Sequence, residues 1–131
     1  MKKKNGFTLV ELLAVIVILA IILVIAVPQI MSTIDDATKA SLESSAKMVA
    51  AQVENQYAIA QSLGKEGFVT TNGDCMQGWA GLNNIDYDSC TYNVSATGTA
   101  QVTIEGKGKF AGYTCTNATR AEANCAKASG E

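Results

Sequence analysis

The chain has 131 residues, a length that suits one small domain. It has no histidine, so it lacks both the commonest metal ligand and the commonest general base. Setting aside Lys2, Lys3 and Lys4 leaves 7 of the 10 basic residues against 12 acidic ones, a net charge of −5 with no basic patch for nucleic acid. The composition therefore gives no support to an enzyme, a cofactor, a bound metal or a nucleic-acid site.

The N-terminal part is a long apolar run. No polar side chain occurs from Leu12 to Val27, and the stretch from Phe7 to Val27 is interrupted only by Thr8 and Glu11. As a helix, this stretch would span about 31 Å, enough to cross the hydrocarbon core of a bilayer. The three lysines before the run place its N-terminal side in the cytoplasm by the positive-inside rule. The sequence thus predicts a single membrane-spanning helix.

Helical periodicity continues beyond this run, to residue 63. Pro28 removes one backbone hydrogen bond and is expected to kink the helix without ending it. Apolar residues then recur every three or four positions: Leu42, Ala46, Val49, Val53, Tyr57 and Ala60. Glu43 stands four residues before Lys47, a spacing that favours an ion pair on the solvated face. Gly64 is the predicted stop of this amphipathic half.

The C-terminal part, from Phe68 on, is punctuated like β structure. Turn sequences occur at 72–74, 97–98 and 106–108, and residues 85–95 alternate in part. Ala100, Val102 and Ile104 alternate with polar residues along one clear strand, and residues 109–115 follow as another. We predict an α+β fold, in which the amphipathic helix covers one face of a small antiparallel sheet of three or four strands, the fourth near Phe68.

Four cysteines, Cys75, Cys90, Cys115 and Cys125, all lie beyond the apolar run. Their spacings of 15, 25 and 10 residues lack the close pairs of a zinc site, so we predict two disulfides in an exported domain. Of the three possible arrangements we favour Cys75–Cys90 and Cys115–Cys125, because each pair is consecutive and joined by turn-rich chain. In that arrangement Cys125 anchors the polar C-terminal segment.

Glu11 is the residue that the apolar run does not explain. An unpaired carboxylate at a bilayer edge is costly, so a cationic partner is expected. A cut between Gly6 and Phe7 would create an α-amino group one helical turn before Glu11. Pairing that amine with the glutamate of a neighbouring chain would fix the axial register of apolar helices, because other offsets leave the charge unpaired.

The stretch "KKKNGFTLVELL" at 2–13, followed by the apolar run and Pro28, resembles the N-terminus of type IV pilins. The resemblance implies a leader that ends at Gly6, cleavage by a prepilin peptidase and N-methylation of Phe7. It also implies that Glu11 pairs with a neighbour's terminal amine as identical subunits polymerise. Members often carry a glycine in the helix ahead of the proline, where this chain has Ala20.

The resemblance divides the chain into a leader at 1–6, a membrane and filament-core helix at 7–28, an amphipathic half at 29–64 and a disulfide-tied sheet domain at 65–131. Together these make the ladle-like pilin fold. The implied protein is a major pilin, which begins as a single-pass precursor in the cytoplasmic membrane and ends in an extracellular filament. Its implied partners are identical subunits in a helical homopolymer, the prepilin peptidase, the pilus assembly platform and minor pilins. The implied assembly residues are Phe7, Glu11 and Pro28.

Other interpretations of the N-terminal run stay open. A cleaved secretory signal peptide would use the site at 24–26, but the run is long for that class and Pro28 crowds the cut. A minor pilin or a pseudopilin of a competence or type II secretion system is the nearest alternative, although such pseudopilins usually carry a proline-containing loop that this chain lacks. A non-polymerising, membrane-anchored binding domain would leave Glu11 unexplained.

Several smaller motifs have an ordinary interpretation beside a functional one. Oxygen ligands for Ca²⁺ are offered by Asn83, Asn84, Asp86 and Asp88. The EF-hand spacing is missing, so we favour an exposed acidic loop. Asn93 and Asn117 begin glycosylation sequons, which we treat as turn or strand residues. Trp79 is interpreted as cover for a small core in preference to a partner contact.

Overall fold

The computed structural model describes residues 5–128, so the leader lysines and residues 129–131 lie outside the described chain. It consists of one long helix, α1 (Leu9–Ser62), followed by five strands and two short 3₁₀ helices. The strands are β1 (Gly73–Asp74), β2 (Tyr87–Val94), β3 (Ala100–Gly106), β4 (Tyr113–Ala118) and β5 (Cys125–Lys127), and the 3₁₀ helices are η1 (Gly78–Ala80) and η2 (Gly108–Phe110). The chain divides into two compact units, with the boundary between Asp36 and Ala37.

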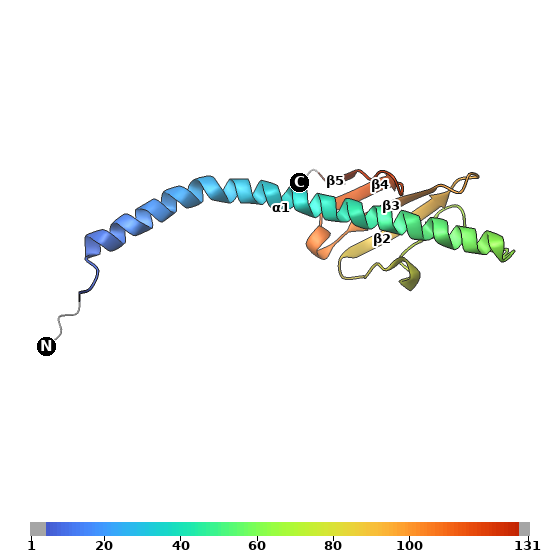
Figure 1. Ribbon diagram of the computed structural model, residues 1–131, viewed down its shortest axis with the longest axis horizontal. Helices are drawn as coiled ribbons and strands as arrows, with labels where there is room; N and C mark the ends of the chain where they lie inside the picture. Colours follow the sequence, from blue (N-terminus) through green and yellow to red (C-terminus); the bar gives the residue numbers. More distant parts are fainter. Residues whose placement is uncertain (1–4, 129–131) are drawn as a thin grey trace. The chain divides into compact units, whose positions relative to one another are not determined.

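The second unit is an antiparallel meander covered on one face by the later turns of α1 (Figure 1). The strand order follows the sequence, β1-β2-β3-β4-β5, and every neighbouring pair is antiparallel. The predicted α+β architecture, with a long helix packed on an antiparallel sheet, is therefore confirmed.

The sheet has five strands, where the sequence predicted three or four. The two additional strands, β1 and β5, are the short edges of the sheet, two and three residues long. Phe68 lies outside the strands, and β1 begins at Gly73, inside a predicted turn. The ring of Tyr92 on β2 lies over Gly73, where any Cβ would collide with it. Strands this short contain too few residues to show an alternating pattern.

Helix α1 ends close to its predicted stop. Gly64 has a left-handed φ of +60°, and its N–H donates to the carbonyl of Gln61. The N–H of Lys65 donates to the carbonyl of Ala60 at 2.9 Å. These two bonds make a Schellman motif, which favours glycine because the left-handed backbone is strained for residues with a Cβ.

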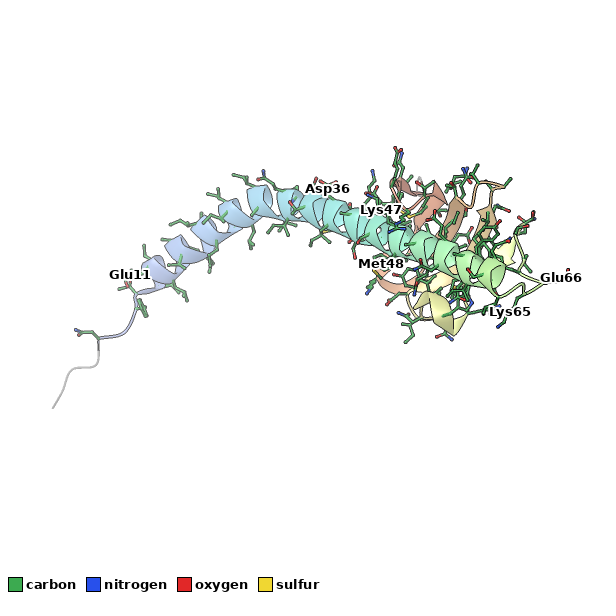
Figure 2. The ribbon with its side chains drawn as sticks, turned by 45° about the vertical axis from the view of Figure 1, so that its right-hand side comes forward. Glu11, Asp36, Lys47, Met48, Lys65 and Glu66 are labelled. Atoms are coloured by element: carbon green, nitrogen blue, oxygen red, sulfur yellow. A yellow bond between two sulfur atoms is a disulfide. The ribbon has the colours of Figure 1, made fainter. Side chains whose placement is uncertain are left out.

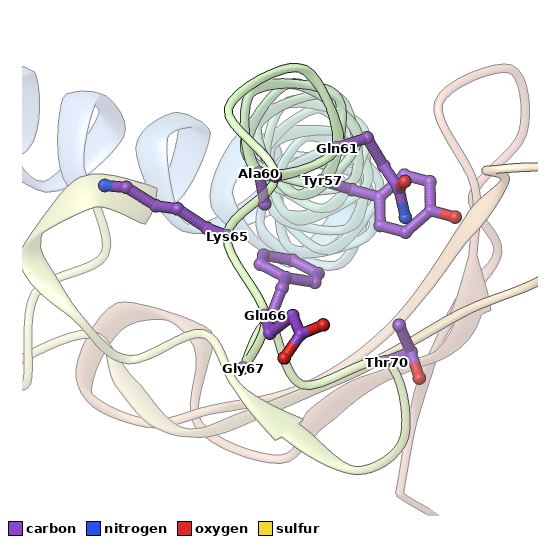
Figure 3. A pocket seen from close by; sticks show the side chains of 9 residues that line it. Tyr57, Ala60, Gln61, Lys65, Glu66, Gly67 and Thr70 are labelled. Carbon is purple, nitrogen blue, oxygen red and sulfur yellow. The ribbon is translucent and has the colours of Figure 1, made fainter.

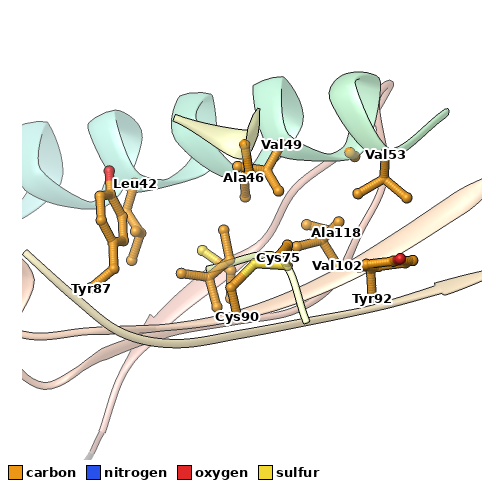
Figure 4. Packing of buried hydrophobic residues seen from close by; sticks show 14 of the residues in the cluster. Leu42, Ala46, Val49, Val53, Cys75, Tyr87, Cys90, Tyr92, Val102 and Ala118 are labelled. Carbon is orange, nitrogen blue, oxygen red and sulfur yellow. A yellow bond between two sulfur atoms is a disulfide. The ribbon is translucent and has the colours of Figure 1, made fainter. Parts of the chain in front are cut away.

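The core lies between α1 and the sheet (Figure 4). The predicted helical stripe is buried at five of its six positions, with Leu42, Ala46 and Val53 fully inaccessible to solvent. Tyr57 is half-buried and packs edge-on against Phe68, with ring centroids 5.8 Å apart. The opposing sheet face supplies Cys75, Cys90, Tyr92, Val102, Ile104, Cys115 and Ala118. Burying a residue such as leucine contributes about 1.5–3 kcal/mol. Hydrophobic burial along this stripe is therefore the main interaction that holds the helix on the sheet.

Two glutamates on α1 reach across to backbone donors of the sheet. The Glu43 carboxylate accepts a hydrogen bond from the Cys125 N–H at 3.2 Å. The Glu54 carboxylate accepts one from the Ala100 N–H at 3.2 Å. The predicted ion pair of Glu43 is wrong, because Glu43 lies 4.0 Å from Lys39, one turn earlier, and not beside Lys47. Helical spacing places both Lys39 and Lys47 within reach of Glu43. The spacing does not indicate the third contact, the hydrogen bond from Cys125 in β5.

Candidate processing and assembly site

The backbone before α1 is neither helix nor strand from residue 5 to residue 8. Phe7 is 92% exposed, and a Cβ built on Gly6 would meet no atom within 4 Å. The described residues on either side of the peptide bond between Gly6 and Phe7 are therefore exposed. The helix begins two residues later, at Leu9, and not at residue 7 as the periodicity suggested.

Thr8 and Glu11 start the helix with a reciprocal pair of hydrogen bonds. The Glu11 N–H donates to the Thr8 hydroxyl at 3.2 Å, and the Thr8 N–H donates to the Glu11 carboxylate at 3.1 Å. The Thr8 carbonyl accepts the first helical bond, from Leu12, at 3.2 Å. This is a capping box, in which the threonine is the N-cap and the glutamate is the third helical residue. It satisfies two backbone donors at the helix start that have no intrahelical partner.

The capping box gives Glu11 a partner that the sequence analysis did not consider. The carboxylate also lies in the first turn, where the helix dipole favours a negative charge. The signal was present in the sequence, since a threonine followed three residues later by glutamate ahead of an apolar run is the capping-box pattern. The expected pairing of Glu11 with a terminal amine at Phe7 stays a prediction, because residue 7 is joined to Gly6 here.

The large apolar side chains in the first half of α1 are exposed. From Phe7 to Val27, every large apolar side chain is between 49% and 92% exposed. By length and composition α1 can cross a membrane, and none of its most apolar 18-residue window is buried. Side chains project from this part of the helix in all directions, and Glu11 lies at its start (Figure 2). A helix that is apolar all round belongs in lipid or among other helices.

The helix continues through both Ala20 and Pro28. Proline has no N–H, so the carbonyl of Val24, four residues earlier, lacks its usual helical donor. One turn later the Thr33 hydroxyl donates to the carbonyl of Gln29 at 3.0 Å, a local bond that often accompanies helix bending. Pro28 thus marks the one described position in α1 where the backbone ladder is interrupted by a missing donor.

The four cysteines form two disulfides in the second unit. Cys75 is bonded to Cys90 and Cys115 to Cys125, which is the arrangement that the sequence analysis favoured. The first bond joins the residue after β1 to β2, and the second joins β5 to β4. All four side chains are buried. Each disulfide therefore ties one edge strand to its inner neighbour.

In the acidic loop before β2, the Asp86 carboxylate is paired with side chains of the same chain. The Asn83 amide donates to the Asp86 carboxylate at 3.2 Å, and the Lys109 ammonium lies 3.4 Å from the same group. Desolvation raises the pKa of Asp86, but the hydrogen bonds from Asn83 and Lys109 and the lysine charge outweigh it, so the pKa lies below its usual value. Within residues 5–128, no group of three or more acidic, cysteine or histidine residues could hold a metal ion.

The two sequon asparagines and Trp79 all lie within regular elements of the second unit. Asn93 lies in β2 and accepts a hydrogen bond from the Asn72 N–H at 2.8 Å. Asn117 lies in β4 with a left-handed φ of 53°. Trp79, in η1, packs edge-on against Tyr92 with ring centroids 6.2 Å apart. Trp79 is half-buried and covers the edge of the core.

Comparison with known families gives one match, over the N-terminal fifth of the chain. Residues 1–27 match the family described as the prokaryotic N-terminal methylation motif. No curated protein and no solved structure matches the chain. The matched segment contains the Gly6–Phe7 bond, the capping box and almost all of the uncovered apolar helix. Residues 1–27 therefore match the class III signal peptide of type IV pilins, and an α+β pilin-like architecture follows them, a combination that supports a type IV pilin-like or pseudopilin precursor.

Proposed function

We propose that the chain is the major subunit of a type IV pilus, which is processed at its N-terminus and then polymerised into a helical surface filament. The observation that carries the proposal is the uncovered apolar helix directly behind the methylation motif. Such a helix is stable in lipid, and it is equally stable when identical helices surround it. A filament subunit uses both environments in turn, first as a membrane precursor and then as part of a polymer.

Processing would occur at the bond between Gly6 and Phe7. Prepilin peptidase would remove residues 1–6 on the cytoplasmic side and methylate the new terminus at Phe7. The open backbone at residues 5–8 supports this, because a peptidase needs access to the bond that it cuts. The new amine would stand at the positive end of the helix dipole, so the Glu11 carboxylate would offset both positive charges.

Assembly would then use Glu11 as the device that sets the register. In the single chain its carboxylate bonds the Thr8 N–H. In the filament it would also accept the terminal amine of a neighbouring subunit, while apolar side chains exchange lipid for one another. Neighbours at other offsets would leave that amine and carboxylate without a partner in an apolar core, which is costly. Pro28, with its missing donor, is proposed as the place where the helix adapts to its neighbours.

The precursor and the filament would each have their own location and partners. The precursor would span the cytoplasmic membrane once, with the leader inside and the sheet outside. An assembly platform with minor pilins would extract it and add it to identical subunits. The two disulfides support a location of the sheet outside the cytoplasm, where such bonds persist. No catalytic role is proposed.

The test is replacement of Glu11 by alanine in cells that make filaments. We expect filaments in sheared surface fractions to fall at least tenfold, while the processed chain still enters the membrane. A matched control is Glu122→Ala, which removes an exposed glutamate from the sheet unit and should leave filament yield unchanged. Mass spectrometry of the sheared material should find a chain that begins with N-methylated Phe7. Wild-type protein that never forms filaments would instead indicate an anchored binding domain, and a trace amount in filaments would indicate a minor pilin.

A further inference from the structure

A pocket of about 460 Å³ lies past the last turn of α1, wholly within the second unit (Figure 3). Its chemically distinctive lining residues are Tyr57, Gln61, Lys65, Glu66, Phe68 and Thr70. None of them belongs to the processing site. The volume is in the range of small-ligand sites, and the lining combines aromatic rings with a few polar groups, as such sites do.

The first favourable feature for a ligand here is the helix end itself. The C-terminal end of a helix carries a partial negative charge, which is normally offset by a basic side chain in the last turn. Helix α1 has no basic residue in its last turn. Gln61 and the turn glycine Gly64 line the pocket, so its wall includes this negative pole, of which the Schellman motif satisfies the carbonyls of Ala60 and Gln61.

The second feature is the pair of aromatic rings. Tyr57 and Phe68 meet edge to face, with centroids 5.8 Å apart and planes at 62°. Both rings line the pocket and both are half-buried, which fixes their position while leaving aromatic surface accessible. The face of an aromatic ring attracts a cation within about 6 Å of its centroid.

The third feature is the placement of the two charged side chains. The Glu66 carboxylate lies on the side of Tyr57, Gln61 and Thr70, whereas Lys65 extends to the opposite side (Figure 3). No ion pair joins Lys65 to Glu66 in the described chain. The Gln61 amide and the Thr70 hydroxyl add neutral oxygen acceptors. Carboxylate, ring faces and helix pole therefore favour the same sign of charge.

We propose that this pocket is a binding site for an organic cation, an alkylammonium or guanidinium group. The rings contact its apolar surface, Glu66 balances its charge, and Gln61 and Thr70 accept hydrogen bonds from whatever N–H or O–H donors it carries, which in choline is the hydroxyl alone. Two sources supply this chemistry at a cell surface. One is the basic side chain of an adjacent subunit, and the other is a free cation such as choline. The site does not depend on the filament proposal, because all its residues belong to one chain.

The test is an NMR titration of the full chain in detergent micelles with choline chloride. We expect saturable shifts of the Tyr57 and Phe68 ring signals and of the amides at 66–70, with affinity in the millimolar range. The uncharged isostere of choline, in which carbon replaces the quaternary nitrogen, should bind about fivefold more weakly or worse. Sodium chloride at the same ionic strength should give no saturable shift.

Variants separate the three features. Glu66→Gln should weaken choline binding severalfold, and Tyr57→Leu should remove most of the ring-dependent binding. Glu122→Gln, an equivalent change far from the pocket in sequence, should leave binding unchanged. Equal binding of the isostere, shifts reproduced by sodium chloride, or unchanged affinity in Glu66→Gln would overturn the inference.

Assembled filaments identify the source of the cation. Choline binding that persists in filaments means that the pocket is open to free cations. Binding that is lost in filaments, together with filaments of Glu66→Gln that break at lower shear, means that a neighbour's basic side chain fills it. Loss of binding in filaments that Glu66→Gln leaves equally strong would rule out a cation in the assembled pocket. Failure to form filaments would bear on the proposed function only, because the micelle titration stands by itself.

Discussion

The two halves of helix α1 differ in what covers them. Between residues 9 and 27, the large apolar side chains are all at least 49% exposed, and they point in every direction. Between residues 42 and 53, apolar residues form one stripe, and that stripe is at most 1% exposed. Both halves are regular helix, so backbone conformation does not distinguish them. The distribution of apolar residues around the axis decides whether a helix is covered by its own chain or by other molecules.

The comparison also separates two kinds of stability. The second half contributes to the folding of one chain, because its stripe is buried in every molecule that folds. The first half is exposed in the single chain, since none of its most apolar 18-residue window is buried, so it is not expected to contribute to that folding. Its apolar surface becomes a source of free energy only when lipid or other helices surround it. Changes in the two halves should therefore have separate effects.

The largest expected effect comes from removing both disulfides by changing all four cysteines to serine. Loops of 10 and 15 residues each contribute about 3 kcal/mol in the chain-entropy treatment, and the total approaches the whole stability of a small domain. We expect the sheet to unfold near 37 °C in detergent micelles, while the first half of α1 stays helical. Near-ultraviolet circular dichroism reports the sheet unit, and residue-level NMR reports the helix. A sheet that melts at the wild-type temperature would contradict this.

The next effect compares two leucines on the same helix. Leu42 is fully buried, and Leu42→Ala should lower the free energy of unfolding of the second unit by about 2–5 kcal/mol. Leu19 is 51% exposed, and Leu19→Ala should leave that free energy unchanged in micelles. Urea unfolding of both variants, followed through the Trp79 fluorescence, measures the difference. Equal losses would mean that the two halves are energetically coupled.

A smaller effect concerns the start of the helix. Thr8→Val removes the capping hydroxyl and should cost about 1 kcal/mol, felt as fraying of the first turn. Amide hydrogen exchange at Val10 and Glu11 should quicken several-fold in micelles. Thr33→Val is the matched control, because Thr33 bonds a carbonyl within the same helix and caps nothing. Unchanged exchange in Thr8→Val would show that the capping box does not hold the helix start.

The smallest effect is a pH dependence in the loop before β2. The pKa of Asp86 is lower in the folded chain than its usual value, so its charged form stabilises the fold. That contribution is present above the usual value of 3.8 and is lost as the pH falls through the folded value. An NMR titration should show Asp86 protonating below 3.8, and Lys109→Gln should move its pKa upward. A pKa at or above 3.8 in the wild type would contradict the ion pair.

The sequence predicted most of what depends on repeated patterns. The helical stripe, the long strand β3 and the stop at Gly64 each rest on several residues or on one residue with a special backbone preference. The methylation motif is positional, so its residues are recognisable without any structure. The order of the cysteines left three pairings open and favoured the consecutive one, which is the pairing in the structure.

The missed features depend on contacts between distant segments or on very short ones. Strands β1 and β5 contain too few residues to alternate, and they pair because the meander brings them to its edges. Glu43 bonds Cys125, which lies 82 residues later in the sequence, so no local spacing indicates the contact. Thr8 is different, because its capping signal, a glutamate three residues later ahead of an apolar run, is local and recognisable in the sequence.

The covalently tied edges of the sheet have a consequence for copies of the chain that meet at high concentration. Exposed edge strands are templates on which β-sheets of separate molecules join, and such joining leads to aggregates. Here both edges are very short, and each is fastened to its inner neighbour. Crowded copies are thus discouraged from adhering side by side through their sheets. Self-association is left to the apolar helix, the surface that lipid would shield before the proposed assembly.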